Sequence, residues 1–278
     1  MAVKACFFDI DGTLLDHGNG SVMPESTRRA LKALKRRGVK TYIASGRGPF
    51  MLGQVRELFD FDGYISANGQ WIEDGTGQPY QTLTHRPEDI RALAELGKRE
   101  GFSAMIIEGM ESFPLADDGV NRQLYGWLGT PLPPLYDLAR LAEHPVIQFT
   151  VHLDNSAVGA GIEGYLERGR ALLAPLEGVE VTSAGGGILD CIPVGGGKEV
   201  GIRLVCERLG IRQEETAVFG DGVNDLRMLA WAGTGVAMGN APDNVKEQAD
   251  YVTAPVGEEG IARALVHLGV LTPEDLAE

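Results

Sequence analysis

The feature that most constrains the fold is an alternation of short apolar runs with amphipathic helical stretches. Near the start of the chain, apolar runs indicate buried strands and a spacing of three to four between apolar residues indicates helices. These segments are a strand at 3–9, a helix at 24–37, a strand at 39–47, a helix at 49–59 and a strand at 62–69 that ends in the Asn-Gly turn signal of Asn68 and Gly69. Strand, helix, strand, helix, strand is typical of a parallel sheet with helices on its faces.

The same alternation returns in the last third of the chain. It consists of a helix at 198–209, a strand at 216–221, a helix at 224–232, a strand at 234–240 and a helix after Pro242. Between the two halves, helical stretches such as 87–100 and 161–176 are mixed with alternating strands such as 146–154 and 180–192. We therefore predict an α/β core made of residues 1–83 and 190–278, interrupted by an inserted α+β domain at 84–189.

Composition limits the partners of such a protein. Hydrophobic residues make up 44% and charged residues 23% of the 278 residues, which is typical of a soluble globular protein. The formal net charge of −14 argues against nucleic acid or an anionic membrane as a partner. The sequence contains neither a secretory signal nor an apolar run of membrane-spanning length, so we expect a cytoplasmic protein. Cys6, Cys191 and Cys206 are expected to be reduced core thiols.

Four polar clusters follow predicted strands or the insert. In open parallel sheets, ligands bind beyond the carboxyl ends of the strands, so these clusters are candidates for one shared site. The clusters are Asp9 with Asp11, Ser45 with Gly46 and Arg47, Lys198 alone, and Asp221 with Asn224 and Asp225. Each cluster alone could be a turn or a helix cap. Their recurrence at one edge of the sheet favours a functional site.

Carboxylates gathered at one point repel one another unless a cation neutralises them. Mg²⁺ prefers oxygen ligands and is commonly bound by one or two carboxylates together with phosphate oxygens, so Asp9 and Asp221 are candidate ligands. Lys198 adds a positive charge, and the Ser45 hydroxyl with the backbone N–H groups of Gly46 and Arg47 could bind an anion. This combination suits a phosphate group. One carboxylate could then act as a nucleophile, with its neighbour two residues on as general acid and base.

These motifs resemble those of the haloacid dehalogenase superfamily, and specifically its Cof-type phosphatases with a large type-II cap. The resemblance extends over the whole chain and follows the family's order: "DIDGTLL", "ASGR", Lys198 and "GDGVNDLRML", with "EEGIARAL" similar to the family's tail. It implies a Rossmann-like parallel sheet with strand order 5-4-1-2-3 and an inserted α+β cap domain. That order would place the strands that lead to Asp221 and Ser45 on either side of the strand that leads to Asp9.

The resemblance also implies a role for each motif residue. Asp9 would be the nucleophile and Asp11 the general acid and base. Mg²⁺ would be bound by Asp9, the backbone carbonyl of Asp11, and Asp221. The phosphate would be held by Ser45, Gly46, Lys198 and Asn224, with Arg47 as a further candidate, while Asp225 would support the metal's water ligands or Lys198.

The third motif departs from the family pattern. The family usually has Gly-Val-Ser/Asn-Lys-Gly there, whereas this chain has "VGGGKEVG", with Glu199 directly after Lys198. Whether Glu199 and Arg47 touch the substrate site is left open by the sequence. In the insert, polar residues could select the leaving group, although a solvated surface explains each of them more simply. Those residues are Glu108, Asp118, Asn121 and Arg122.

We therefore predict a Mg²⁺-dependent phosphatase of small phosphorylated metabolites, with sugar phosphates as the leading substrate class and the insert closing over the site. The oligomeric state and the physiological substrate are not predicted. "GGGK" lacks the residues of a nucleotide-binding P-loop, and "GTGVAMG" misses the dinucleotide-binding spacing by one residue. Three alternatives stay open: a phosphomutase of the same superfamily, a phospho-acceptor signalling module, and a binding protein without turnover.

Overall fold

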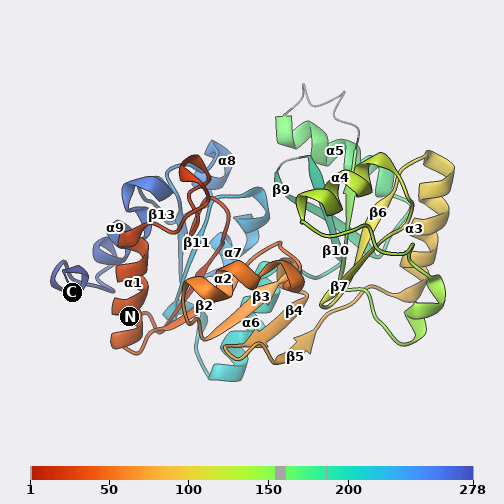
Figure 1. Ribbon diagram of the computed structural model, residues 1–278. Coiled ribbons are helices and arrows are strands. Elements are labelled where there is room, and N and C mark those ends of the chain that lie inside the picture. Colours follow the sequence, from red (N-terminus) through yellow and green to blue (C-terminus); the bar gives the residue numbers. More distant parts are fainter. Residues whose placement is uncertain (1, 154–160, 186, 278) are drawn as a thin grey trace. The chain divides into compact units, whose positions relative to one another are not determined.

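The computed structural model describes residues 2–153, 161–185 and 187–277, and the chain forms two compact units (Figure 1). The first consists of Met1–Arg47, Leu52–Gln81 and Gly197–Glu278, and the second of Gly48–Met51 and Thr82–Gly196. This division differs from the boundaries expected from sequence at the end of the insert. Residues 190–196 group with the second unit because strand β10 (Ile188–Pro193) is hydrogen-bonded into that unit's sheet.

The first unit is built on an eight-stranded sheet with the order β13-β12-β11-β1-β2-β3-β4-β5. Strand β1 pairs in parallel with both β11 and β2, so it lies between them. The stretch β12-β11-β1-β2-β3 confirms the expected order 5-4-1-2-3, whereas β4, which pairs antiparallel with β3, and β5 were missed from sequence. The bounds are β1 (Ala5–Phe8), β2 (Lys40–Ala44), β3 (Gly63–Ser66), β4 (Trp71–Asp74), β5 (Pro79–Thr82), β11 (Thr216–Gly220), β12 (Thr234–Ala237) and β13 (Tyr251–Val252).

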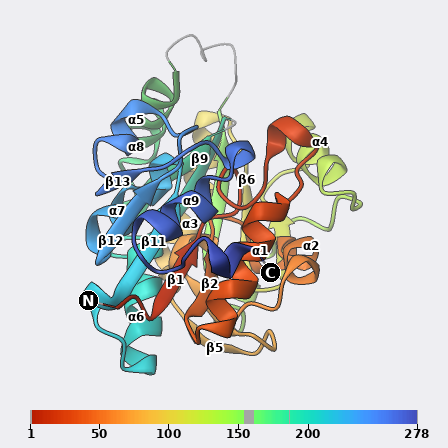
Figure 2. The same cartoon turned by 90° about the vertical axis from the view of Figure 1, so that its left-hand side faces the viewer.

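Helices cover both faces of this sheet because successive strand side chains point to opposite faces. Phe8 of β1 packs in one apolar core with Leu31 of α1 and Ile261 of α9, while Phe7 packs in the other with Ile202 of α6. In Figure 2, α1 and α9 lie side by side, and the two helices are in contact. The helices of this unit are α1 (Glu25–Arg36), α2 (Gly53–Leu58), α6 (Lys198–Leu209), α7 (Leu226–Trp231), α8 (Asp243–Lys246) and α9 (Gly260–His267).

The second unit is built on a five-stranded antiparallel sheet with the order β7-β6-β8-β10-β9. Its strands are β6 (Ala104–Glu108), β7 (Glu111–Pro114), β8 (Gln148–His152), β9 (Val179–Gly185) and β10, and its helices are α3 (Pro87–Glu100), α4 (Gly119–Trp127) and α5 (Gly161–Leu173). The predicted strand at 180–192 is therefore two strands. A mostly parallel sheet interrupted by an α+β insertion is the fold class predicted from sequence.

Two polar residues of the insert are not solvated, contrary to expectation. Glu108 is buried, accepts a hydrogen bond from the Tyr136 hydroxyl at 2.7 Å and forms an ion pair with Arg140 at 2.7 Å. Asn121 is also buried, and its side-chain amide donates to the Ser103 hydroxyl at 2.8 Å. Both side chains therefore serve the internal structure of the second unit, because a buried polar group needs such partners.

The three cysteines are free and buried, as the sequence predicts for core thiols. Among the helices that the structure describes, none combines the length and the apolar character needed to cross a lipid bilayer.

Candidate active site

Asp9 lies at the carboxyl end of the central strand. Its backbone N–H continues the β1 ladder by donating to the Phe219 carbonyl of β11 at 2.9 Å, and the residue is only 7% exposed. Gly12 follows with a positive φ of 84°, and a Cβ atom there would collide with the Asp221 carboxylate. A glycine is thus required both by the backbone and by the closeness of the two acidic motifs.

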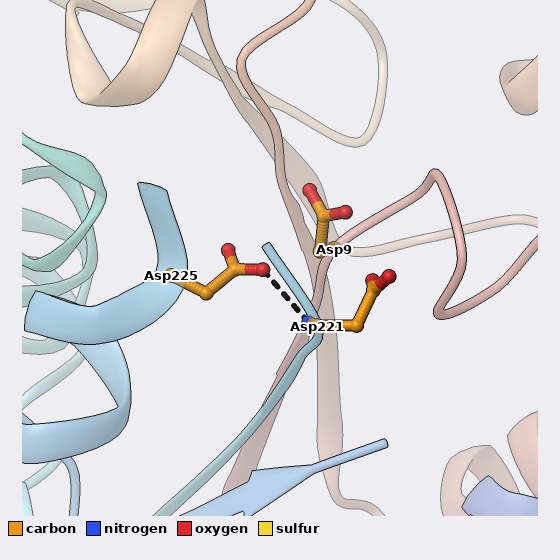
Figure 3. A group of neighbouring side chains, drawn as sticks. All are labelled: Asp9, Asp221 and Asp225. Atoms are coloured by element: carbon orange, nitrogen blue, oxygen red, sulfur yellow. Dashed lines mark hydrogen bonds between the residues drawn. The ribbon is translucent and has the colours of Figure 1, made fainter. Parts of the chain in front are cut away.

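Figure 3 shows Asp9, Asp221 and Asp225 gathered at this edge of the sheet, after β1, after β11 and at the start of α7. One carboxylate oxygen from each residue lies within 4.8 Å of the other two. Asp225 is fully buried, and one of its oxygens accepts the backbone N–H of Asp221 at 2.9 Å and of Gly222 at 2.8 Å. Asp221 in turn accepts the Thr13 hydroxyl at 2.8 Å. The sequence prediction that Asp9 and Asp221 meet is confirmed.

Lys198 connects two members of this cluster. It is the first residue of α6, is 1% exposed, and its Nζ lies 2.6 Å from an oxygen of Asp9 and 2.6 Å from an oxygen of Asp225. Burial lowers the pKa of Lys198, but the two carboxylates outweigh burial and raise its pKa above the ordinary value. The lysine therefore carries its positive charge at neutral pH.

The cluster holds more negative charge than this single lysine balances. Burial raises the pKa of Asp9 well above its usual value, Lys198 opposes this, and the Asp225, Asp221 and Asp11 carboxylates add to the rise. Burial together with Asp225 also raises the pKa of Asp221 to about 6. Such a set of carboxylates favours uptake of protons or binding of a cation. Its donor atoms are all oxygen, which fits a hard divalent ion such as Mg²⁺.

Asp11 lies in a different environment, although it is only two residues from Asp9. Its carboxylate accepts hydrogen bonds from Arg47 Nε at 2.8 Å and Nη2 at 2.5 Å, and it lies 2.8 Å from His17 Nε2. Burial raises the pKa of Asp11, but the hydrogen bonds and charges of Arg47 and His17 outweigh burial and lower it. Sequence reasoning missed this pair and considered Arg47 only as a phosphate ligand.

The remaining phosphate-site candidates lie in the same unit. Ser45 follows β2, is buried, and its hydroxyl accepts the Arg47 backbone N–H at 3.2 Å; Gly46 lies between them. Asn224 follows β11 and donates from Nδ2 to the Asn68 carbonyl oxygen Oδ1 at 3.0 Å. Asn68 was noticed in the sequence only as part of an Asn-Gly turn, so its side-chain contact was missed.

Glu199, the departure from the third motif, turns toward helix α7. Its carboxylate forms an ion pair with Arg227, and 12% of its side chain is exposed. The two residues join the first turn of α6 to α7. Lys198 meanwhile contacts Asp9 and Asp225, so neighbouring residues of one helix turn toward different partners.

A family model described as haloacid dehalogenase-like hydrolase matches residues 6–265. The chain belongs to this family. YkrA of Bacillus subtilis (strain 168), which its name classes provisionally as a phosphatase, is 35% identical over 273 residues, covering 98% of this chain and 100% of that protein. The 5-amino-6-(5-phospho-D-ribitylamino)uracil phosphatase YcsE of the same organism is 26% identical, over 95% of each chain.

Solved structures of this superfamily have the same fold. The subclass IIB sugar phosphatase BT4131 superposes with a TM-score of 0.82 at 32% identity, covering 97% of this chain and 100% of that one. The phosphatase BT1666 of Bacteroides thetaiotaomicron gives a TM-score of 0.84 at 28% identity, covering 97% and 96%. This haloacid dehalogenase-like protein is thus a phosphatase, a phosphoric monoester hydrolase.

Proposed function

We propose that this phosphatase hydrolyses small phosphorylated metabolites, with sugar phosphates as the leading class, by a Mg²⁺-dependent reaction through an aspartyl-phosphate on Asp9. The observation that carries the proposal is the arrangement of Asp9 on the central strand, hydrogen-bonded to Lys198 and grouped with Asp221 and Asp225. A carboxylate in this setting can be a nucleophile, because Lys198 beside it, together with a bound Mg²⁺, would hold the phosphoryl group against it.

The first step forms a bond between an Asp9 carboxylate oxygen and phosphorus and breaks the bond from phosphorus to the ester oxygen. Asp11 gives a proton to that departing oxygen, so an alcohol leaves. In the second step, Asp11 takes a proton from water, whose oxygen attacks phosphorus. The bond between phosphorus and the Asp9 oxygen breaks, so inorganic phosphate is released and Asp9 is a free carboxylate again. The lowered pKa of Asp11 beside Arg47 suits the second step, which needs the carboxylate form. Proton donation in the first step requires Asp11 to leave Arg47.

Mg²⁺ would be held by Asp9, the backbone carbonyl of Asp11, and Asp221, and when bound it supplies positive charge beside the transferred phosphoryl oxygens. Asp225 fits a supporting role, because it accepts the backbone N–H of Asp221 and binds Lys198. Lys198, Ser45, Gly46 and Asn224 would bind the phosphoryl oxygens. That Arg47 also binds phosphate stays a prediction.

The substrate class is supported by similar proteins. One of the similar structures is a sugar phosphatase, and YcsE is named for a substrate that carries a phosphorylated ribityl chain. The acidic composition argues against nucleic acids and anionic membranes as substrates or partners. Three free, buried cysteines agree with a reducing compartment, so we propose the cytoplasm.

The test is release of inorganic phosphate from a panel of sugar phosphates, nucleotides and cofactor phosphates, with Mg²⁺ and with EDTA. We expect turnover that is fastest for sugar phosphates and disappears with the chelator. Exchange of phosphate between sugar hydroxyls with little release would instead indicate a phosphomutase. Stable phosphorylation of the protein without turnover would indicate a phospho-acceptor module, and turnover that is indifferent to EDTA would contradict the metal.

A further inference from the structure

The turn after β3 has an unusual backbone. Ala67, Asn68 and Gly69 have φ values of 49°, 53° and 100°, three consecutive residues in the left-handed region. Residues other than glycine rarely adopt this region, and it costs about 1–3 kcal/mol at each strained position. Ala67 has no side-chain hydrogen bond that could favour it. A buried turn held in this form must be fixed by its surroundings.

Those surroundings include the second motif, "ASGR" at 44–47. The Ala67 N–H donates to the Arg47 carbonyl at 2.7 Å, and the Asn68 N–H donates to the Ser45 carbonyl at 2.9 Å. The left-handed turn therefore directs two consecutive N–H groups at the segment after β2. This segment carries Ser45 and Gly46, which the proposed function assigns to phosphate binding.

The turn also packs against the third motif. Gly69 lies so close to Gly197 that a Cβ atom at Gly69 would collide with the Gly197 carbonyl oxygen, directly before Lys198. On the next turn of the helix, a Cβ atom at Gly201 would lie 3.1 Å from the Gly69 Cα and 2.6 Å from a methyl carbon of Ile65. Glycines on both sides let the start of α6 approach the turn closely, so the turn limits where Lys198 can lie.

The side chain of Asn68 contacts the fourth motif, "GDGVNDLRML", which contains Asn224. Asn68 is 1% exposed, and its Oδ1 accepts the hydrogen bond from Asn224 Nδ2 at 3.0 Å, between residues 156 positions apart. An Asn side-chain amide has two N–H groups, so this bond fixes the plane of the Asn224 amide while leaving a second donor on the same nitrogen. Asn68 thus sets the direction in which Asn224 can donate.

We propose that Asn68 is a positioning residue of the phosphate site, and that the turn Ala67–Gly69 holds the second, third and fourth motifs in register. The proposal rests on the proposed function, in which Asn224 binds phosphate. A turn needed only for its shape would be satisfied by glycine at position 68. The hydrogen bond to Asn224 is the feature that a purely structural turn does not need, and this distinction is testable.

The experiment uses the substitution Asn68→Gly, which keeps the left-handed backbone and removes the side chain. Asn68→Ser is the second variant, because serine tolerates this region, as Ser21 does in this chain with a φ of 58°. Both are combined with Asn224→Ala in double-mutant cycles, and Asn244→Gly in helix α8 is the matched control. Each variant is assayed for phosphate release from a sugar phosphate, competitive inhibition by inorganic phosphate, and thermal unfolding.

We expect Asn68→Gly to lower kcat/KM and to weaken inhibition by inorganic phosphate about 3- to 10-fold, the range of one hydrogen bond. In the Asn224→Ala background the same change should have almost no further effect, because the Asn224 amide that Asn68 orients is already absent. Asn244→Gly should leave both quantities at the wild-type level. If Asn68→Gly does not fold, Asn68→Ser provides the same cycle.

Two results would overturn the inference alone: wild-type phosphate inhibition in both Asn68 variants, or a full, additive loss when either is combined with Asn224→Ala. In these cases the wild-type protein still releases phosphate and Asn224→Ala still impairs it, so the proposed function stands. If the wild-type protein releases no phosphate, or if Asn224→Ala has no effect, the function or the role of Asn224 fails first and the inference fails with it.

Discussion

Asp9 and Asp11 belong to the same three-residue motif but lie in opposite environments. Burial raises the pKa of both carboxyls. At Asp9 three other carboxylates add to this effect and Lys198 only partly opposes it, so the pKa stays raised. At Asp11 the hydrogen bonds and charges of Arg47 and His17 reverse it, and the pKa is lowered. The comparison teaches that the neighbours of each carboxylate, and not the motif itself, separate the proposed metal-side nucleophile from the proposed proton-transfer group.

The largest effect is expected for Asp9→Asn. The amide cannot form the acyl phosphate, so phosphate release should fall by about 10⁴-fold or more for sugar phosphates and aryl phosphates alike. The protein should fold, because Lys198 keeps its ion pair with Asp225 at 2.6 Å. Phosphate release and thermal unfolding measured on the same sample check this. Substantial turnover by a folded Asp9→Asn protein would show that Asp9 is not the nucleophile.

Asp11→Asn should distinguish the role of Asp11 from that of Asp9, because its effect on the rate is expected to depend on the leaving group. With a sugar phosphate we expect a loss of about 10²- to 10⁴-fold, since the poor leaving group needs a proton. An aryl phosphate with a good leaving group needs none in the first step, so stopped-flow should show a burst of aryl alcohol stoichiometric with enzyme. Slow turnover should follow, because the second step lacks its base. The wild-type protein is the control, and an equal loss for both substrates without a burst would contradict the proton-transfer role.

The acidic cluster was predicted well from the sequence because Asp9 and Asp221 lie at the ends of strands. Asp9 and Asp221 each follow a buried apolar strand, and parallel strands that are neighbours in the sheet bring such residues together. The same argument correctly placed Ser45, at the end of the strand on the other side of β1. These predictions needed no side-chain detail, only the strand ends and the strand order that the family resemblance implies.

The contacts that were missed depend on side-chain direction and loop conformation. The pairing of Arg47 with Asp11 joins two loops and depends on where two side chains point, which periodicity does not describe. Asn68 was recognised as a turn signal, but the left-handed conformation of Ala67 before it has no signature in the sequence. In the insert, Glu108 resembled a surface charge because its partner Arg140 lies 32 positions away. Long-range polar pairs of this kind are decided by tertiary structure.

Arg47→Lys should have a smaller effect than Asp11→Asn. Lysine keeps the positive charge but cannot form two parallel hydrogen bonds with the Asp11 carboxylate. We expect kcat for a sugar phosphate to fall about 10-fold, while the first step with an aryl phosphate, followed by stopped-flow release of the aryl alcohol, keeps its wild-type rate. Inhibition by inorganic phosphate measures the alternative role. If Arg47→Lys and Arg47→Met weaken that inhibition and slow the first step, then Arg47 binds phosphate. In that case another group must account for the difference between Asp11 and Asp9.

The smallest expected effect is a pH-dependent stabilisation by Mg²⁺. The pKa of Asp221 is raised to about 6 in the folded protein, so without metal its contribution to stability is largest at low pH and declines as the pH rises from the unfolded-state pKa toward about 6. Above about 6 the carboxylate is charged and Mg²⁺ no longer competes with a proton. Binding to the folded state alone then adds stability, at roughly 2–4 °C of Tm for each kcal/mol of binding free energy.

Thermal unfolding with Mg²⁺ and with EDTA, at about pH 7.5 and about pH 5, measures this difference without any substrate. We expect a clear rise in Tm with Mg²⁺ at the higher pH and little or none at the lower. Asp221→Asn should raise Tm in EDTA, because it removes one of the repelling charges, and should abolish the Mg²⁺ response. The Asp11→Asn variant should keep that response, since only the backbone carbonyl of Asp11 is proposed to bind the metal. Loss of the Mg²⁺ response in Asp11→Asn but not in Asp221→Asn would show that the cation binds beside the Asp11 carboxylate, which contradicts the proposed metal site.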